Sequence, residues 1–159
     1  MDEIRIIKLV QQLVQMCSRL HSNNITIGYL HPNNIFIDED DDEACLVTDV
    51  GLAYMPGIEA STSVQLNFQA PEVKGKTGYE LKKAVSDSVG TADLKSIGLI
   101  AIYLLTGTTG YTSQDLSESG WYCSEEMVLF IKKTEDENPY QRLNADALLR
   151  LPLFNKDRL

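Results

Sequence analysis

Apolar residues recur every three or four positions through the first twenty residues of the chain. The residues that share this spacing fall on one face of a helix: Ile6, Leu9, Val10, Leu13, Met16, Cys17 and Leu20. Asp2 is placed to cap the start of this helix, and the polar run 22–24 is placed to end it. The pattern therefore predicts an amphipathic helix from about residue 3 to about residue 22.

Two short apolar runs follow, at 35–37 and 45–47, with the acidic run 38–43 between them. Short β-branched and aromatic runs joined by a polar turn are typical of a β-hairpin. Because two strands alone are barely stable in water, the hairpin is expected to lie on helices.

Residues 51–70 and 74–92 show little periodicity and are rich in turn-forming or polar residues, so long loops are predicted there. A Gly/Ser/Thr-rich stretch from Gly107 to Gly120 is predicted to be irregular as well.

A helix that opens at Asp93 is apolar on every side through Leu105, which predicts a helix at the centre of the fold that ends at Gly107. Ser124 is predicted to cap a further helix that closes before Pro139, and Asn144 to cap a last one that ends at Pro152. The predicted fold class is mainly α with a small β-hairpin, in one domain over 1–159.

Composition narrows the function classes. The formal net charge is −9 over 159 residues, and no basic cluster is present, which argues against nucleic-acid binding. No membrane-length apolar run and no signal peptide are visible, so a cytoplasmic or nuclear protein is expected. Cys17, Cys45 and Cys123 form no CxxC pair, and neither histidine has a cysteine at the spacing of zinc-finger motifs. Free thiols and no metal site are therefore expected.

Five short motifs stand in a fixed order. They are His31-Pro32-Asn33-Asn34, Asp49-Val50-Gly51, Ala70-Pro71-Glu72, Asp93-Leu94-Lys95-Ser96-Ile97-Gly98 and Pro139-Tyr140-Gln141-Arg142. Each motif alone is weak, but this order and spacing resemble the large, C-terminal lobe of eukaryotic protein kinases over essentially the whole chain. The resemblance places the catalytic-loop region at 25–37 and a degenerate activation segment at 49–72.

The resemblance also implies roles for single residues. Asn34 and Asp49 match the two residues that hold Mg²⁺ in kinases. Glu72 and Arg142 match a buried ion pair that ties the activation segment to the lobe. Asp93 matches a carboxylate that hydrogen-bonds the backbone of the catalytic loop. These last three are expected to hold the fold and not to do chemistry.

The catalytic loop departs from the kinase pattern at its most important position. Tyr29 stands where the resemblance places the catalytic Asp, and a phenol with a pKa near 10 cannot accept a hydroxyl proton near pH 7. His31 replaces a Lys that neutralises the transferred phosphoryl group, and Gly28 replaces an Arg that grips a phosphorylated activation loop. Residues 61–63 lie where activation loops of kinases are phosphorylated, but we expect them to form a solvated polar loop.

The chain opens at the helix before the catalytic loop, with no Gly-rich phosphate loop and no strand Lys ahead of it. The small lobe is thus expected to be absent, leaving an apolar face that a protein partner would cover. The leading hypothesis is a pseudokinase lobe that acts as a scaffold or structural subunit. The alternatives are a residual Mg²⁺/ATP binder with a regulatory role, an active kinase split over two chains, and an unrelated helical domain.

Overall fold

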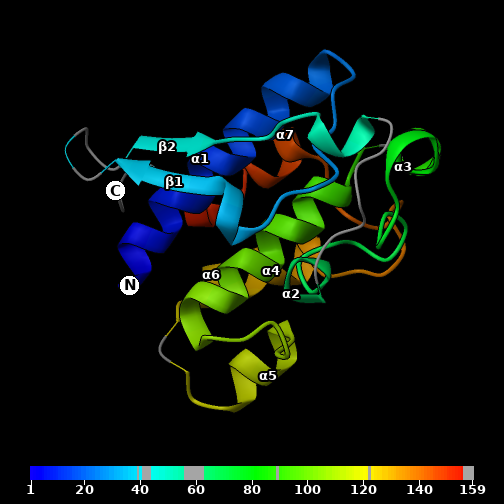
Figure 1. The fold of residues 1–159 in the computed structure, drawn as a ribbon. Coiled ribbons are helices and arrows are strands. Elements are labelled where there is room, and N and C mark those ends of the chain that lie inside the picture. The colour runs from blue at the N-terminus through cyan, green and yellow to red at the C-terminus, as the bar shows by residue number, and fades with distance from the viewer. Residues whose placement is uncertain (39, 41–43, 56–62, 89, 122, 156–159) are drawn as a thin grey trace.

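The computed structural model describes residues 1–38, 40, 44–55, 63–88, 90–121 and 123–155 (Figure 1). Within them the fold is mainly helical with one two-stranded antiparallel sheet, as the hydrophobic pattern predicts.

Helix α1 spans Glu3–Ser22 and forms where the first apolar stripe predicts it. The Asp2 side chain accepts a hydrogen bond from the backbone N–H of Arg5 at 2.8 Å, which satisfies one of the free donors at the helix start. The buried residues of α1 lie on one face: Ile6, Ile7, Leu9, Val10, Leu13, Val14 and Cys17.

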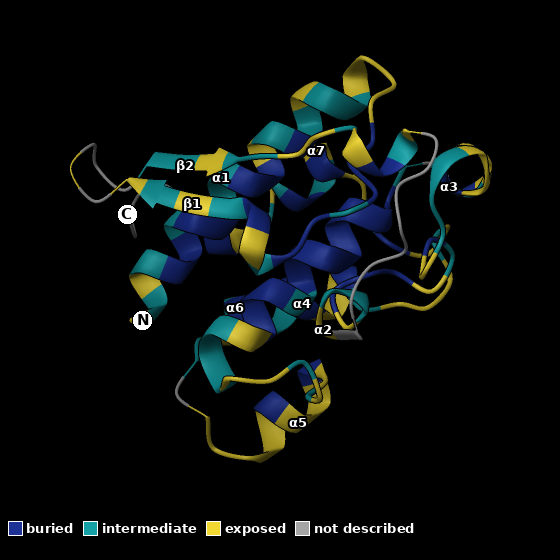
Figure 2. Ribbon diagram, viewed as in Figure 1, coloured by how far each residue is buried: buried dark blue, intermediate teal, exposed yellow. Residues whose placement is uncertain are grey.

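Helix α4 spans Ala92–Thr106 and crosses the middle of the molecule (Figures 1 and 2). It packs against α1 and against α6, which spans Glu125–Thr134. Gly107 adopts a left-handed φ of 82° and ends α4, which is the cap that the sequence predicts. The prediction of a central, nearly all-apolar helix is confirmed.

Strands β1 (Ile35–Asp38) and β2 (Ala44–Val47) pair antiparallel, with Phe36 opposite Leu46. Ile35, Ile37, Cys45 and Val47 pack on the main core, and β2 lies against α1. Phe36 and Leu46 point the other way and stay 54% and 63% exposed. The hairpin thus covers the core with one face and leaves the other face apolar and uncovered within the described residues.

The remaining elements are short. They are the 3-10 turns η1 (Pro32–Asn34), η2 (Leu52–Tyr54) and η3 (Pro152–Phe154) and the helices α2 (Ser63–Leu66), α3 (Gly78–Asp87), α5 (Ser113–Glu118) and α7 (Ala145–Leu148).

The predicted loops at 51–70, 74–92 and 107–120 are wrong in part, because they contain the helices α2, α3 and α5. In α3 only Leu81 is fully buried, so the apolar stripe is too thin to stand out against its Lys and Ser residues. In α5 a capping box joins Thr112 and Asp115, and Leu116 is the main apolar anchor. Helix α6 also ends at Thr134, earlier than the Pro139 stop that the sequence predicts.

A small second cluster lies beside the main core, under α3. Ala53, Ala70, Val73, Leu81 and Ala92 are buried in it, and the rings of Tyr29 and Tyr54 pack against it. Among the helices of the described chain, none is by itself long and apolar enough to cross a membrane. Helices α3 and α4 reach that length and composition only together, with a bend of 95° between them.

Candidate functional site

One buried carboxylate holds the backbone of the loop from residue 25 to residue 34. Asp93, at the start of α4, is 1% exposed and accepts hydrogen bonds from the backbone N–H groups of Ile27 at 2.8 Å and Gly28 at 2.7 Å. His21 Nε2 lies 3.0 Å from Asp93 Oδ2. A carboxylate that accepts several hydrogen bonds is stable when buried, so Asp93 fixes the backbone ahead of Tyr29.

Asn34 fixes the other end of the same loop. Its side-chain nitrogen donates to the carbonyl of Tyr29 at 2.9 Å, and its side-chain oxygen accepts the N–H of His31 at 3.1 Å. The residue is 1% exposed. Both polar atoms of the Asn34 amide therefore bond the backbone of the loop and stabilise its conformation.

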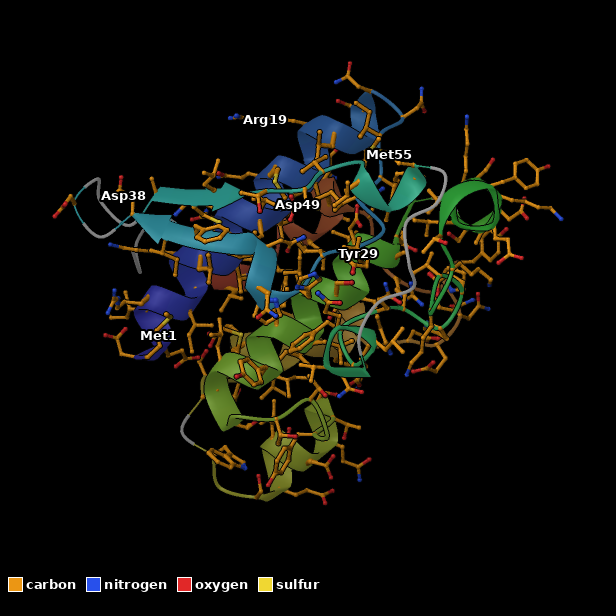
Figure 3. All side chains as sticks on the ribbon, viewed as in Figure 1. Met1, Arg19, Tyr29, Asp38, Asp49 and Met55 are labelled. Atoms are coloured by element: carbon orange, nitrogen blue, oxygen red, sulfur yellow. The ribbon has the colours of Figure 1, made fainter. Side chains whose placement is uncertain are left out.

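Tyr29 lies between these two anchors and is half-buried (Figure 3). Its hydroxyl donates a hydrogen bond to Gln65 Oε1 of α2 at 3.0 Å. Its ring also meets the His31 ring edge to face, with 5.0 Å between the ring centres. The phenol therefore joins the loop to the segment that carries α2.

His31 is 5% exposed, and its Nδ1 accepts the backbone N–H of Asn33 at 3.2 Å. Nδ1 thus carries no proton, and the neutral ring has its N–H at Nε2. Nε2 is buried and has no hydrogen-bond partner among the described residues. Burial lowers the pKa of His31, and the Asp49 carboxylate opposes this shift only in part. The ring is therefore neutral near pH 7.

Asp49 stands in the turn after β2, exposed and with a left-handed φ of 61° (Figure 3). A positive φ is uncommon for a residue with a side chain, although Asp tolerates it better than most. No described residue forms a hydrogen bond or ion pair with its carboxylate. Asp49 and Asn34 therefore differ in environment. Asp49 is exposed to solvent, whereas Asn34 is buried and hydrogen-bonded to the loop backbone.

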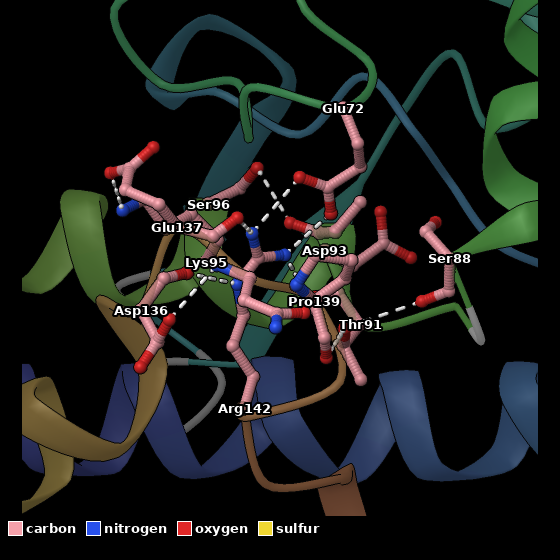
Figure 4. Close-up of polar contacts among 12 residues, drawn as sticks. Glu72, Ser88, Thr91, Asp93, Lys95, Ser96, Asp136, Glu137, Pro139 and Arg142 are labelled. Carbon is pink, nitrogen blue, oxygen red and sulfur yellow. Dashed lines mark hydrogen bonds and ion pairs between the residues drawn. The ribbon is translucent and has the colours of Figure 1, made fainter.

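Glu72 and Arg142 form a two-pronged ion pair, at 2.5 Å between Oε1 and Nη1 and 2.9 Å between Oε2 and Nη2 (Figure 4). The Arg142 side chain is fully buried and also donates to the carbonyls of Asp136 and Glu137. Buried Lys95 contacts the same turn, with the Glu135 carbonyl and the Glu137 carboxylate as its partners. These contacts tie the segment at Glu72 to the turn before α7.

Gly28 adopts a φ of 70°, and a side chain there would have little space. A Cβ at this position would lie 3.0 Å from Tyr54 Oη and 3.2 Å from Leu81 Cδ1. The Tyr54 hydroxyl donates to the carbonyl of Thr26 at 2.6 Å, and burial holds the pKa of Tyr54 well above its ordinary value. The small second cluster thus fills the space beside the loop.

No protein-family model matches the chain. Curated relatives do match. The chain is 28% identical to CBL-interacting protein kinase 20 of Oryza sativa subsp. japonica, a match that covers 91% of this chain and 34% of the relative. It is 30% identical to the probable serine/threonine-protein kinase pXi of Dictyostelium discoideum, over 91% of this chain and 21% of that one. The chain therefore spans about a third or less of the length of these relatives.

Among solved structures, a crystal structure of Rad53 1–466 in complex with AMP-PNP superposes with a TM-score of 0.72. That match covers 98% of this chain and 41% of the Rad53 chain, at 22% identity. The chain is a protein kinase-like large lobe. Both the relatives and the fold agree with the resemblance that the five motifs indicate.

The structure brings the predicted residues of this kinase-like lobe into two groups. Tyr29, Asn34 and His31 meet in the loop that Asp93 holds, and Glu72 meets Arg142 at a separate place. Among the described residues, the Asp49 carboxylate forms no hydrogen bond or ion pair with either group, and its influence on His31 is electrostatic. Of the polar loop at 61–63, residues 61 and 62 lie outside the described part of the chain.

Two partners were not predicted from the sequence. Gln65, which accepts the hydrogen bond from the Tyr29 hydroxyl, lies in a stretch of the sequence with no periodicity. No neighbouring motif identifies it as a partner of Tyr29. His21 lies four residues after Cys17 on α1, and this spacing puts both on one helix face. Their common neighbour Asp93 is 72 residues from His21 and is visible only in the fold.

Proposed function

We propose that this lobe does not transfer phosphate and that it works as a protein-binding scaffold or structural subunit. The observation that carries the proposal is the hydrogen bond from Tyr29 to Gln65, 3.0 Å long, at the position where the kinase resemblance places the catalytic base. A neutral phenol that already donates its proton to a neighbouring amide cannot take a proton from a substrate hydroxyl.

Three neighbouring features favour the same conclusion. His31 is neutral and buried, so it adds no positive charge for a phosphoryl group. The space that a longer residue at position 28 would need is filled by Tyr54 and Leu81. The Asn34 side-chain oxygen faces the loop backbone and is not turned toward solvent. Phosphoryl transfer depends on positioning and charge, and this loop retains little of either.

The scaffold role rests on the outer face of the hairpin. Phe36 and Leu46 lie directly opposite each other and are both more than half exposed. Val50 and Leu52, which follow β2 in the sequence, are exposed as well, at 43% and 38%. Large apolar side chains that gather on one face mark an interaction site. We call these four residues the hairpin face and propose that it contacts an apolar surface of another protein or of another part of the same protein.

A site-specific cross-linker tests this role in the full-length protein. A photoreactive residue at Leu46 is expected to give a protein adduct in cells, while the same residue at Glu118, exposed on α5, gives little. Mass spectrometry of the adduct separates a partner chain from a contact within the chain. Equal labelling from both positions would contradict a docking role for the hairpin face.

A second candidate function is residual binding of Mg²⁺ and a nucleotide. It is favoured by Asp49, whose exposed carboxylate has no competing partner among the described residues and is held in a strained turn. Binding of Mg²⁺·ATP that Asp49→Asn abolishes would support this candidate. Because Asn34 is committed to the loop, we expect any such binding to be weak.

A further inference from the structure

We propose that Cys17, His21 and Asp93 together bind one divalent metal ion of the zinc class. This site lies behind the catalytic loop and is independent of the function proposed above. It is not among the positions to which the kinase resemblance gives a metal.

The three side chains come from two helices that pack against each other. Cys17 and His21 are four residues apart and therefore share a face of α1, and Asp93 lies in the first turn of α4. Their ligand atoms all lie within 4.8 Å of one another. Cys17 and Asp93 are buried, and the His21 side chain is 18% exposed, so their positions are fixed by the core around them.

The spacing of His21 and Asp93 suits a tetrahedral ion after a small adjustment. Metal–nitrogen and metal–oxygen bonds of about 2.1 Å at a tetrahedral angle separate the two ligand atoms by about 3.4 Å. His21 Nε2 and Asp93 Oδ2 are 3.0 Å apart, so they need to open by only a few tenths of an ångström. Thiolate, imidazole and carboxylate are the ligand types that zinc takes in proteins.

The charges also balance. One thiolate and one carboxylate neutralise a divalent ion, and the imidazole binds as a neutral ligand. The ion takes the place of the Nε2 hydrogen that lies between His21 and Asp93 Oδ2, and that hydrogen moves to Nδ1, so the imidazole binds as its neutral Nδ1–H tautomer. The Cys17 S–H bond breaks as the sulfur–metal bond forms, so one proton is released to solvent for each ion bound.

His21 gives the ion a route to the site. It lines a cavity of about 650 Å³ together with Thr26, Tyr54 and Lys82. A water molecule in this cavity can complete the fourth coordination position, as in metal sites with three protein ligands. Because Asp93 also holds the backbone of Ile27 and Gly28, the bound ion would join α1 and α4 to the loop that carries Tyr29.

Cobalt substitution tests the site in the full-length protein after treatment with a chelator. One equivalent of Co²⁺ is expected to give a thiolate-to-cobalt absorption band, and Zn²⁺ is expected to displace it, raise Tm and release one proton per ion. Cys17→Val, which keeps an apolar side chain of similar size in the core, should lose the band. Cys45→Val is the matched control, since Cys45 is a half-buried thiol on the hairpin, and it should keep the band.

His21→Gln decides the case if Cys17→Val does not fold. The amide of Gln can still donate to Asp93 but is a poor metal ligand, so the affinity for Co²⁺ should fall at least about tenfold. The proposal is overturned if the wild-type protein shows no thiolate band, or if the band survives in Cys17→Val or at full affinity in His21→Gln. A band lost in Cys45→Val alone would also overturn it.

Discussion

Gly98 shows how little freedom a single position has in the centre of this fold. It lies on α4 against Thr134 of α6, where an added Cβ would come within 2.0 Å of Thr134 Oγ1 and 2.9 Å of Thr134 Cβ. Thr134 is itself fully buried and cannot move aside. The two helices therefore approach as closely as they do because position 98 has no side chain.

Gly98→Ala is predicted to lower the free energy of unfolding by about 1–3 kcal/mol, or to prevent folding, because α4 and α6 must separate. Urea unfolding measures the change. Gly110→Ala is the matched control: its Cβ would meet only Thr108 Oγ1 at 3.6 Å, so little change is expected. Equal effects of the two variants would mean that α4 and α6 are not packed as described.

His31 is predicted to make stability depend on pH. Burial holds its pKa below the ordinary value of 6.5, so the unfolded chain takes up a proton at pH values where the folded ring stays neutral. The stability that His31 contributes is complete above about pH 6.5 and is lost as the pH falls through the folded pKa.

A comparison with His31→Gln isolates this effect from the carboxylates, which titrate in both proteins. Between about pH 7.5 and about pH 5.5, urea unfolding should show a larger loss of stability in the wild type than in the variant. Identical losses would contradict a buried, neutral His31.

At the scale of elements, the Glu72–Arg142 pair joins the segment at Glu72 to the turn before α7. Glu72→Gln leaves a fully buried guanidinium without its counter-charge and should cost about 3–5 kcal/mol. The double variant Glu72→Gln with Arg142→Met should cost less than the sum of the two single changes. Glu118→Gln, on the exposed surface of α5, should change stability by less than about 0.5 kcal/mol. Additive effects in the cycle would contradict a direct pair.

The elements that the sequence predicts well are those with many buried residues or clear caps. Helix α4 is almost wholly apolar, α1 carries a complete stripe, and the caps Asp2, Ser124 and Asn144 all form as expected. The sequence pattern does not predict α3, because Leu81 is the only fully buried residue of this helix, or α5, because its capping box stands in a Ser/Thr-rich stretch. Short helices that are stabilised by tertiary contacts leave too weak a periodic signal.

The candidate site follows the same rule. Motif order is enough to find Tyr29, Asn34, Asp49, Glu72, Asp93 and Arg142, because a motif is local in sequence. The contact from Tyr29 to Gln65 spans 36 residues, and the contact from His21 to Asp93 spans 72. No periodicity or motif spacing in a single sequence indicates either contact, and both are visible only in the folded structure.

At the scale of the whole molecule, two groups of contacts meet at the loop that carries Tyr29. Asp93, at the start of α4, holds the backbone of this loop, and the small second cluster with Tyr29 and Tyr54 fills the space beside the loop. The hairpin face is exposed and lies outside the buried residues of both clusters, as Figure 2 shows for the outer side of β1 and β2. Stability and partner binding are therefore expected to respond to different substitutions in this lobe.

Transfer of labelled phosphate from ATP by the full-length protein tests the central claim most directly. The account predicts that the wild type transfers no more phosphate to itself or to a general protein substrate than Asp49→Ala does, since Tyr29 supplies no base. Phosphate transfer by the wild type that Asp49→Ala abolishes would contradict it.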